Sequence, residues 1–417
     1  MPCDCSHFHT VPACITCYNE YIDRLNSTIL PEFGAPVPEW TDTRSHFRRK
    51  ETSMSDTPSN AHPALAAGTM NFGFMKAESA PPNGRDVAVI GAGPSGLATA
   101  GYLACLGYQV HVYDKLPKPG GLMVFGIPSH RIPADRIQRG VRDLERRLGV
   151  VFRTNTKVCC SAPMHEEEGD HFACDILSLN DLVDNYDAVM ICSGSWKSRK
   201  LGIAGENLKG VYSGLEFLFP IRAIKYASTN VSVPDVKDKV VAVIGAGHSA
   251  VDVVDSAISL GAAKVHLVYR KTVREAPCGS FEIDRMREMG CEWMERCTPV
   301  AVHGEDRVQA LEVANGITGE NVVLPVDVVV GAIGEIPTPP FQKELGLENV
   351  RRGEVRWLNM TAIDNVFVAG DVLSGPSKIG KAVYSGLRAA RSLSNWLDLK
   401  AQHREDEYNF EADKMTR

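Results

Sequence analysis

The chain has 417 residues, of which 44% are hydrophobic and 23% charged, an ordinary balance that excludes a wholly disordered chain or a disulfide-dependent miniature fold. Its formal net charge of −6 provides no broad basic field for a nucleic-acid backbone, so nucleic acid is not an expected partner. No apolar run of about 18 residues occurs, so a membrane-spanning helix is not expected either. The N-terminus lacks the apolar core of a secretory signal, and the expected location is cytoplasmic.

Four cysteines, with the spacing C-x-C-x8-C-x2-C, lie within the first 17 residues: Cys3, Cys5, Cys14 and Cys17. In a long chain without an export signal, such a cluster is more typical of metal binding than of disulfides. Thiolates suit an iron–sulfur cluster or zinc. Residues 31–84 are rich in Pro, Ser, Thr and Ala, and this composition predicts a linker or an extended arm.

A unit of strand, glycine turn and helix then begins at residue 86. The strand Asp86–Ile90 is followed by the turn Gly91-Ala-Gly93-Pro-Ser-Gly96 and by an apolar helix from Leu97 to Leu106. The solid β-branched and apolar run is typical of a strand that is buried on both faces.

The same unit recurs in the second half of the chain, as the strand Val240–Ile244, the turn Gly245-Ala-Gly247-His-Ser-Ala250 and a helix that ends near Leu260. One glycine turn is a weak signal, but two with correct flanks predict two dinucleotide-binding folds. The first glycine permits a tight turn, the second lets the backbone approach a pyrophosphate, and the third position lets the helix pack on the strand. The phosphates lie at the N-terminus of the helix.

The charges that follow the two units predict different nucleotides. In the first unit the next strand, Gln109–Tyr113, ends at Asp114, whose carboxylate can bridge ribose hydroxyls and would repel a 2′-phosphate. In the second unit the corresponding strand ends in Arg270 and Lys271, with Arg274 close behind. These cations suit a 2′-phosphate and favour NADP over NAD, although an arginine that stacks on adenine and a solvated pair are alternatives.

A third segment near the C-terminus completes the first site. The strand Asn365–Ala369 precedes Gly370 and Asp371, and Ile379-Gly-Lys381 opens a helix over Ala382–Leu397. An aspartate at a strand end can hold a ribitol hydroxyl, and a helix N-terminus can stabilise negative charge on a reduced flavin ring. A surface turn before an amphipathic helix is the alternative interpretation.

The sequence thus predicts an α/β fold with two Rossmann-like dinucleotide-binding domains, one for FAD and one for NAD(P), preceded by a short Cys-rich N-terminal arm. The expected boundaries are 1–84 for the arm and linker, 85–200 for the first part of the FAD-binding domain, 201–335 for the NAD(P)-binding domain, 336–399 for the second part of the FAD-binding domain, and 400–417 for a charged, frayed tail.

Seven motifs follow one another along the chain: VAVIGAGPSGL at 87–97, PGGLMVFGIPSHRIP at 119–133, DAVMICSGS at 187–195, VVAVIGAGHSAVD at 240–252, YRKTVREAP at 269–277, GAIGEIPTP at 331–339 and VFVAGDVLSGP at 366–376. In these motifs, from about residue 80 to 397, the chain resembles the glutamate synthase small-subunit family of FAD/NAD(P) flavoproteins, which includes the FAD/NADPH half of dihydropyrimidine dehydrogenase and flavin subunits of iron–sulfur oxidoreductases. The resemblance implies the disulfide-reductase-like flavoprotein fold.

The resemblance also implies which residues bind the two cofactors. For FAD these are Gly91, Gly93, Pro94, Ser95, Gly96, Asp114, Gly121, Leu122, Arg131, Gly370, Asp371, Lys381 and Ala382. For NAD(P) they are Gly247, His248, Ser249, Arg270, Lys271, Arg274 and the strand end from Ala332 to Gly334. No side chain is expected to be catalytic, because a hydride passes from nicotinamide C4 to flavin N5 and the cofactors supply that chemistry.

Two departures from the family pattern matter. In full-length relatives a helical domain with two [4Fe–4S] clusters precedes the FAD motif, whereas here only 90 residues with four cysteines precede Gly91. At most one [4Fe–4S] cluster is therefore expected on the N-terminal cysteines, and zinc or no metal at all are the alternatives. Asp114 stands where glutamate is usual, which keeps the charge but shortens the reach.

The route by which electrons leave also follows from the cysteines. Disulfide reductases on this fold have a CxxxxC pair after the first glycine motif or a CxxC pair in the nucleotide domain, and neither occurs at those places in this chain. The adjacent Cys159 and Cys160 are interpreted as structural. By elimination the outlet is an iron–sulfur centre in this chain or in a partner.

We therefore expect a flavoprotein subunit that moves electrons between NAD(P)(H) and the iron–sulfur centres of a partner subunit or ferredoxin. The expected assembly is a hetero-oligomeric iron–sulfur oxidoreductase, of which the tungsten aldehyde oxidoreductase type is one example. The alternatives are a stand-alone NAD(P)H oxidoreductase that reduces ferredoxin, quinone or a dye, and a glutamate synthase small subunit. The direction of electron flow stays open.

Overall fold

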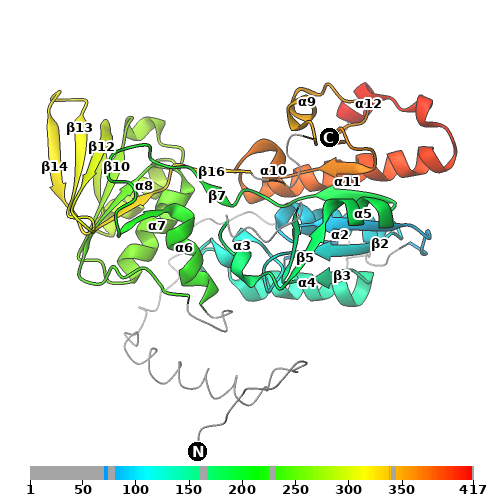
Figure 1. Cartoon of the computed structure of the whole chain (residues 1–417), viewed down its shortest axis with the longest axis horizontal. Coiled ribbons are helices and arrows are strands. Elements are labelled where there is room, and N and C mark those ends of the chain that lie inside the picture. The colour runs from blue at the N-terminus through cyan, green and yellow to red at the C-terminus, as the bar shows by residue number, and fades with distance from the viewer. Residues whose placement is uncertain are drawn as a thin grey trace, which may run out of the picture. The chain divides into compact units, whose positions relative to one another are not determined.

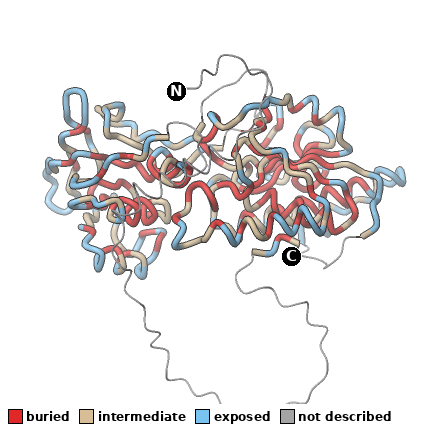
Figure 2. The backbone as a smooth tube through the Cα atoms, turned by 90° about the horizontal axis from the view of Figure 1, so that it is seen from below, coloured by how far each residue is buried: buried red, intermediate tan, exposed pale blue. Residues whose placement is uncertain are grey.

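A computed structural model describes residues 70–73, 80–159, 167–224, 231–337, 339 and 344–415. Two five-stranded parallel sheets dominate these residues (Figure 1). Burial is concentrated in the strands and in the helix faces that pack on them, as Figure 2 shows. Within the described residues, no helix is both long enough and apolar enough to cross a bilayer.

The first sheet has the strand order β17-β6-β1-β2-β3. Its strands are β1 (Asp86–Ile90), β2 (Gln109–Tyr113), β3 (Val151–Arg153), β6 (Ala188–Ile191) and β17 (Val366–Val368). Strand β17 comes from the C-terminal part of the chain and pairs in parallel with β6, so the chain returns to complete the sheet that it began. The strand that was predicted at Asn365–Ala369 therefore forms.

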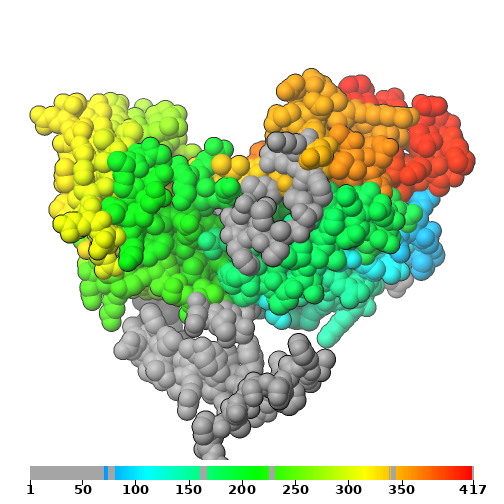
Figure 3. All heavy atoms as spheres, viewed as in Figure 1, coloured from blue at the N-terminus to red at the C-terminus, as the bar shows by residue number. Residues whose placement is uncertain are grey.

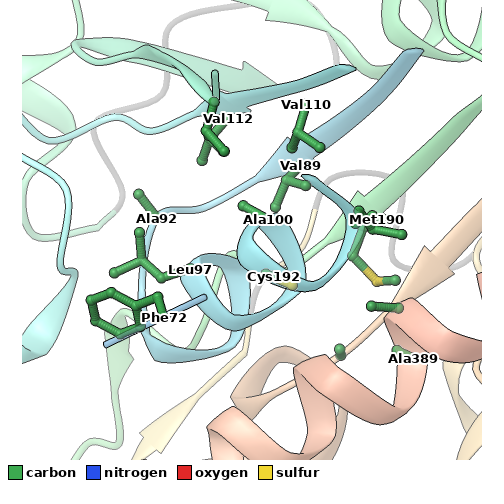
Figure 4. Close-up of a cluster of buried hydrophobic side chains, with 14 of the residues drawn as sticks. Phe72, Val89, Ala92, Leu97, Ala100, Val110, Val112, Met190, Cys192 and Ala389 are labelled. Atoms are coloured by element: carbon green, nitrogen blue, oxygen red, sulfur yellow. The ribbon is translucent and has the colours of Figure 1, made fainter. Parts of the chain in front are cut away.

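Helices cover both faces of this sheet. On one face lie α2 (Pro94–Cys105), α4 (Ala134–Leu148) and α11 (Ile379–Ala401), and on the other lie α5 (Leu179–Asn185) and α9 (Leu347–Arg352). Figure 4 shows the core on the first face, where Val89 of β1 and Met190 of β6 meet Leu97 and Ala100 of α2 and Ala389 of α11. The result is a three-layer α/β/α arrangement.

A glycine permits the close packing of α11 on α2. A Cβ atom at Gly386 of α11 would lie 2.3 Å from the Ser95 carbonyl oxygen, which real Cβ atoms do not tolerate. Helix α2 begins at Pro94 and not at the predicted Leu97, because proline suits the first turn of a helix. Helix α11 begins at Ile379 and runs beyond the predicted end at Leu397.

The second sheet has the order β11-β10-β9-β15-β8 and is also parallel. Its strands are β8 (Val211–Ser213), β9 (Val240–Ile244), β10 (Lys264–Tyr269), β11 (Glu292–Glu295) and β15 (Val328–Gly331). One face packs on α6 (Gly214–Ala223), α7 (His248–Ser259) and α8 (Ser280–Glu288). The other face packs on an antiparallel sheet of β12 (Cys297–His303), β13 (Ala310–Asn315) and β14 (Asn321–Pro325).

Two short antiparallel strands, β7 (Lys197–Ser198) and β16 (Glu335–Ile336), lie side by side where the chain passes from one sheet to the other and back. Figure 1 shows this ladder between the two sheets. The predicted domain boundaries near residues 200 and 335 fall in this ladder, and as boundaries they stay a prediction.

The remaining described elements are short: α3 (Leu122–Phe125), β4 (Thr156–Cys159), η2 (Asp170–Phe172), β5 (Asp175–Ser178), η3 (Val273–Glu275), α10 (Asp371–Ser374), η4 (Glu405–Glu407) and α12 (Phe410–Met415).

The expectation of a frayed tail is wrong for residues 402–415. The Tyr408 ring stacks on Trp357 with centroids 3.8 Å apart, and its hydroxyl donates to Asp413 at 2.8 Å. Arg391 of α11 donates to the same carboxylate at 2.7 Å. Charged composition suggested a solvated end, but one aromatic ring and one ion pair are enough to hold this segment on α11.

Candidate dinucleotide-binding site

A cavity of about 1540 Å³ is lined by residues from the carboxyl ends of both sheets. Pockets for one small ligand measure roughly 300–1,000 Å³, so this cavity has room for more than one. Figure 3 shows the surface hollowed between the residues of the second sheet (green and yellow) and the C-terminal residues (orange), and both parts contribute to the lining. Residues 61–417, which include all lining residues, form one compact unit.

Most of the predicted site residues come together here. The lining includes Gly91, Gly93, Pro94, Ser95, Asp114, Gly121, Leu122, Arg131, Asp371 and Ala382 from the predicted FAD set, and Gly247, His248, Ser249, Arg270, Lys271, Ala332 and Gly334 from the predicted NAD(P) set. Four predicted residues lie outside the lining: Gly96, Gly370, Lys381 and Arg274. The assignment of individual residues to FAD or NAD(P) stays a prediction.

The glycines of the first turn have different roles. A Cβ at Gly96 would lie 1.8 Å from the Gly91 carbonyl oxygen, so Gly96 allows α2 to approach β1 and does not face the cavity. A Cβ added at Gly93 would have no protein atom within 4 Å, and the same holds for a Cβ added at Gly247 of the second turn. The open side of both turns is therefore a cradle that a side chain would fill.

The helices that follow the two turns have no side-chain cap. At α2 and α7 no side chain accepts a hydrogen bond from the first N–H groups. By contrast, Ser178 and Ser213 cap α5 and α6 with complete capping boxes. Uncapped N–H groups at the positive end of a helix dipole bind phosphate, so α2 and α7 each offer an anion site where a dinucleotide needs one.

Asp114 holds the first glycine turn in place. Its carboxylate accepts hydrogen bonds from the backbone N–H groups of Ala92, at 2.6 Å, and Leu116, at 2.8 Å. Burial raises the pKa of this carboxyl, and the two N–H groups oppose the rise only in part. A carboxylate has about four lone-pair sites, so capacity remains for ribose hydroxyls. The short aspartate, where the family usually has glutamate, is the residue that ties the turn to the end of β2.

A carboxylate that the sequence reasoning missed lies among the cations of the second unit. Glu275 lines the cavity together with Arg270 and Lys271, and its carboxylate lies 3.4 Å from the Lys271 amine. It also accepts hydrogen bonds from the backbone N–H and the hydroxyl of Thr272, which lower the pKa of the Glu275 carboxyl. The sequence Thr272-Val-Arg-Glu275 contained this signal, since a capping box has Glu or Gln three residues after its Ser or Thr.

His248 is the first residue of α7, and its Nδ1 atom is buried without a hydrogen-bond partner in the described part of the chain. Other atoms of this residue line the cavity at the second glycine turn.

The C-terminal segment places Asp371 at the cavity. Its carboxylate accepts a hydrogen bond from the Ser377 hydroxyl at 2.5 Å, and its backbone carbonyl accepts one from the Ser195 hydroxyl at 3.1 Å. Burial raises the pKa of the Asp371 carboxyl. Gly370 supports this position without lining the cavity, because a Cβ there would lie 2.7 Å from the Ser95 Cβ.

Among the further lining residues that sequence reasoning missed are Trp196, Arg199 and Glu335. The Arg199 N–H donates to the Gly334 carbonyl at 2.9 Å, which keeps the two chain crossings together. Burial, and then the nearby Asp371, raise the pKa of the Glu335 carboxyl. Trp196 and Arg199 follow β6, and the carboxyl end of that strand was the available signal.

Cys192 is the one cysteine among the described lining residues, so they contain no dithiol pair. The Ser95 hydroxyl donates to its sulfur at 3.4 Å, and burial raises the pKa of the thiol to about 11. The described residues do not include the predicted metal ligands Cys3, Cys5, Cys14 and Cys17. They also do not include Cys160, the neighbour of Cys159. Within those residues no group of His, Cys, Asp and Glu has a metal-binding arrangement.

Cys192 is expected to resist alkylation in the native protein. With a pKa of about 11, only about one thiol in ten thousand is ionised near neutral pH, and the thiolate is the nucleophile. Exposed Cys174 is the internal control. Mass spectrometry after brief iodoacetamide treatment should find Cys174 modified and Cys192 intact. Equal modification of both residues would contradict the buried, protonated state.

Two dinucleotide folds whose uncapped glycine turns open on one cavity define an oxidoreductase of the FAD/NAD(P) flavoprotein class. The open cradles at Gly93 and Gly247 and the uncapped N-termini of α2 and α7 fit FAD and NAD(P) as cofactors. Residues 85–386 match the family described as pyridine nucleotide-disulphide oxidoreductase, and the chain belongs to that family. The predicted fold class and the predicted resemblance are confirmed.

Individual relatives show which proteins of this family the chain is similar to. The chain is 32% identical over 336 residues to the NADP(+)-dependent formate dehydrogenase subunit beta of Moorella thermoacetica, covering 76% of this chain and 44% of that one. It is 30% identical over 339 residues to the glutamate synthase [NADPH] small chain of Halomonas elongata, covering 76% and 68%. FprA of Mycobacterium tuberculosis in complex with NADPH is 20% identical, with a TM-score of 0.61 over 80% of this chain and 89% of that one, and shares the fold.

Proposed function

We propose that the chain is an electron-transfer flavoprotein subunit that passes electrons between NAD(P)(H) and the iron–sulfur centres of a partner subunit through FAD. The observation that carries the proposal is the single cavity on which two uncapped glycine-turn helices, α2 and α7, both open. Such a cavity brings two dinucleotides within reach of each other, which hydride transfer requires.

When bound, FAD supplies the conversion between hydride transfer and single-electron transfer. The chain itself supplies binding and orientation. The N–H groups at the start of α2 and α7 hold pyrophosphates, Asp114 receives ribose hydroxyls, and Arg270 and Lys271 favour the 2′-phosphate of NADP(H). Asp371, fixed by Ser377, holds the ribityl end, and the ladder of β7 and β16 keeps the two nucleotide sites side by side.

A partner is proposed because the cavity offers no dithiol for the electrons among its described residues, and because two relatives are named as a beta subunit and a small chain. The glutamate synthase small subunit is the second candidate function, favoured by relatives with that name. A stand-alone NAD(P)H oxidoreductase is the third. In each case we place the reaction in the cytoplasm, and the N-terminal cysteines are proposed to hold one [4Fe–4S] cluster, with zinc or no metal as the other outcomes of a metal analysis.

The full chain, purified without oxygen, tests the function. We expect a yellow protein whose flavin absorbance is bleached by NADPH faster than by NADH, with reoxidation by a viologen dye. Addition of a co-purifying iron–sulfur partner should accelerate electron transfer to that partner's clusters. A protein that binds no flavin when FAD is supplied would refute the proposal, and rapid turnover with quinone or ferredoxin without a partner would support the stand-alone alternative.

A further inference from the structure

Arg131 connects the two halves of the cavity. It lies in the loop between α3 and α4, next to the first sheet, and its guanidinium donates at 2.6 Å to Asp252 of α7, on the second sheet. The same guanidinium lies 3.5 Å from Glu282 of α8. The resemblance assigns Arg131 to FAD alone, whereas the structure shows it bonded to the domain that is proposed to bind NAD(P).

The carboxylates that form ion pairs with Arg131, and the neighbouring carboxylate of Asp255, lie largely out of solvent. The side chain of Asp252 is 9% exposed, that of Glu282 16%, and that of neighbouring Asp255 only 2%. Burial raises the pKa of the Asp252 carboxyl although Arg131 opposes the rise. Three carboxylates in so small a space need cationic partners, because a buried carboxylate without one is strongly destabilising.

Only part of that compensation comes from the second domain itself. Arg285 of α8 binds Asp255 at 2.8 Å and Glu282 at 3.0 Å. The rest comes across the boundary from Arg131, and the ring of His130 also lies across the boundary, 3.5 Å from Asp255. The acidic cluster of α7 and α8 is therefore completed by the loop of the first domain.

The backbone of the loop is also anchored. The N–H groups of Arg131 and Ile132 both donate to the Pro128 carbonyl, at 3.1 and 3.2 Å, so the loop is a tight turn. On the preceding α3, the Val124 carbonyl accepts a hydrogen bond from Arg222 of α6 at 3.1 Å, a second bond between the domains. The guanidinium is thus presented to Asp252 from a defined position.

Asp252 lies four residues beyond His248, one turn along the helix whose N-terminus opens on the cavity. We propose that Arg131 is a positioning residue: its ion pair with Asp252 fixes α7, and any coenzyme held at its N-terminus, in one orientation relative to the flavin-binding domain. Glu282 and the His130–Asp255 contact complete this interdomain clasp. The orientation of the two nucleotides rests on the proposed function, but the clasp between the domains does not.

Hydrogen exchange of the full FAD-loaded chain, without coenzyme, tests the clasp. Asp252→Asn is expected to accelerate exchange in two segments at once, residues 122–133 and α7, by roughly tenfold, a usual size for coupling between sites. Arg131→Gln should do the same, and the double variant should not exceed Arg131→Gln, because that single change already removes the ion pair with Asp252. The matched control is Arg139→Gln, which breaks an exposed pair with Asp135 within α4 and should leave both segments unchanged.

A kinetic readout separates positioning from structural support. With saturating NADPH, Asp252→Asn should slow flavin reduction roughly tenfold while KM and bound FAD stay near the wild-type values, and Arg131→Lys should restore part of the rate lost in Arg131→Gln. Exchange that changes in α7 alone, or additive effects in the double variant, would overturn the clasp. If the wild-type protein shows no reduction by NADPH, the proposed function fails, and the exchange experiment still decides the clasp.

Discussion

Gly93→Ala is expected to give a folded protein that does not retain FAD. The Gly93 backbone has φ −75° and ψ −173°, which alanine adopts readily, and no protein atom lies within 4 Å of the added methyl group. The cost to folding is about 1 kcal/mol or less, that of alanine at a helix N-cap. The methyl group instead occupies the cradle where the pyrophosphate approaches. Loss of two charge-assisted hydrogen bonds, at about 1.5 kcal/mol each, lowers FAD affinity by at least about 100-fold.

The matched variant is Gly247→Ala in the second turn, where φ is −83°, ψ is 177° and the methyl group again meets no protein atom. This protein should be yellow and should fail to bind NADPH, so the two variants separate the two sites. The measurements are flavin absorbance after desalting, thermal unfolding, and NADPH titration.

Gly96→Ala provides the opposite control. Its methyl group would lie 1.8 Å from the Gly91 carbonyl oxygen, so this variant should be destabilised by more than about 3 kcal/mol or fail to fold. Retention of FAD by Gly93→Ala with wild-type affinity would show that the first turn does not bind the pyrophosphate, and the assignment of the two sites would then be wrong.

Removal of the cations after β10 is expected to abolish the preference for NADPH. Arg270 and Lys271 line the cavity beyond the second glycine turn, where a 2′-phosphate would lie. A hydrogen bond to a charged group contributes about 1.5–3 kcal/mol, so Arg270→Ala or Lys271→Ala should lower kcat/KM with NADPH by roughly 10- to 100-fold. With NADH, which has no 2′-phosphate, the change should stay within about threefold.

Glu275→Gln is the control for this prediction. Glu275 lies 3.4 Å from the Lys271 amine and competes with a phosphate for it. Removal of its charge should raise kcat/KM with NADPH by no more than roughly fivefold, since solvent screens an exposed ion pair. Equal losses with NADPH and NADH in Arg270→Ala would show that this side chain stacks on adenine and does not read the phosphate.

Sequence reasoning found those parts of the site whose signal is local. A glycine turn after a buried strand, as at Gly91–Gly96 and Gly245–Ala250, can be recognised in the sequence because the backbone geometry of the turn requires glycine. Strand β2 was predicted with its observed bounds, and β10 and Asp114 followed from the same pattern. Helix starts were less accurate, since Pro94 and Ile379 begin helices earlier than the apolar pattern indicates.

Residues whose role depends on a distant neighbour were beyond such reasoning. Glu335 and Arg199 line the cavity because β7 pairs with β16. The C-terminal segment packs on the rest of the protein because the Tyr408 ring stacks on Trp357. Nothing in the local pattern around these residues indicates the partner.

The amino-acid sequence by itself determined the two dinucleotide folds, their family and the charges at their strand ends, because each follows from a short stretch of chain. Only the tertiary structure decided that both turns open on one cavity, that Gly370 packs on Ser95, and that Arg131 binds Asp252. The physical reason is that an ion pair or a close packing contact depends on the distance between side chains in space, and residues 131 and 252 are brought together only when both sheets have formed.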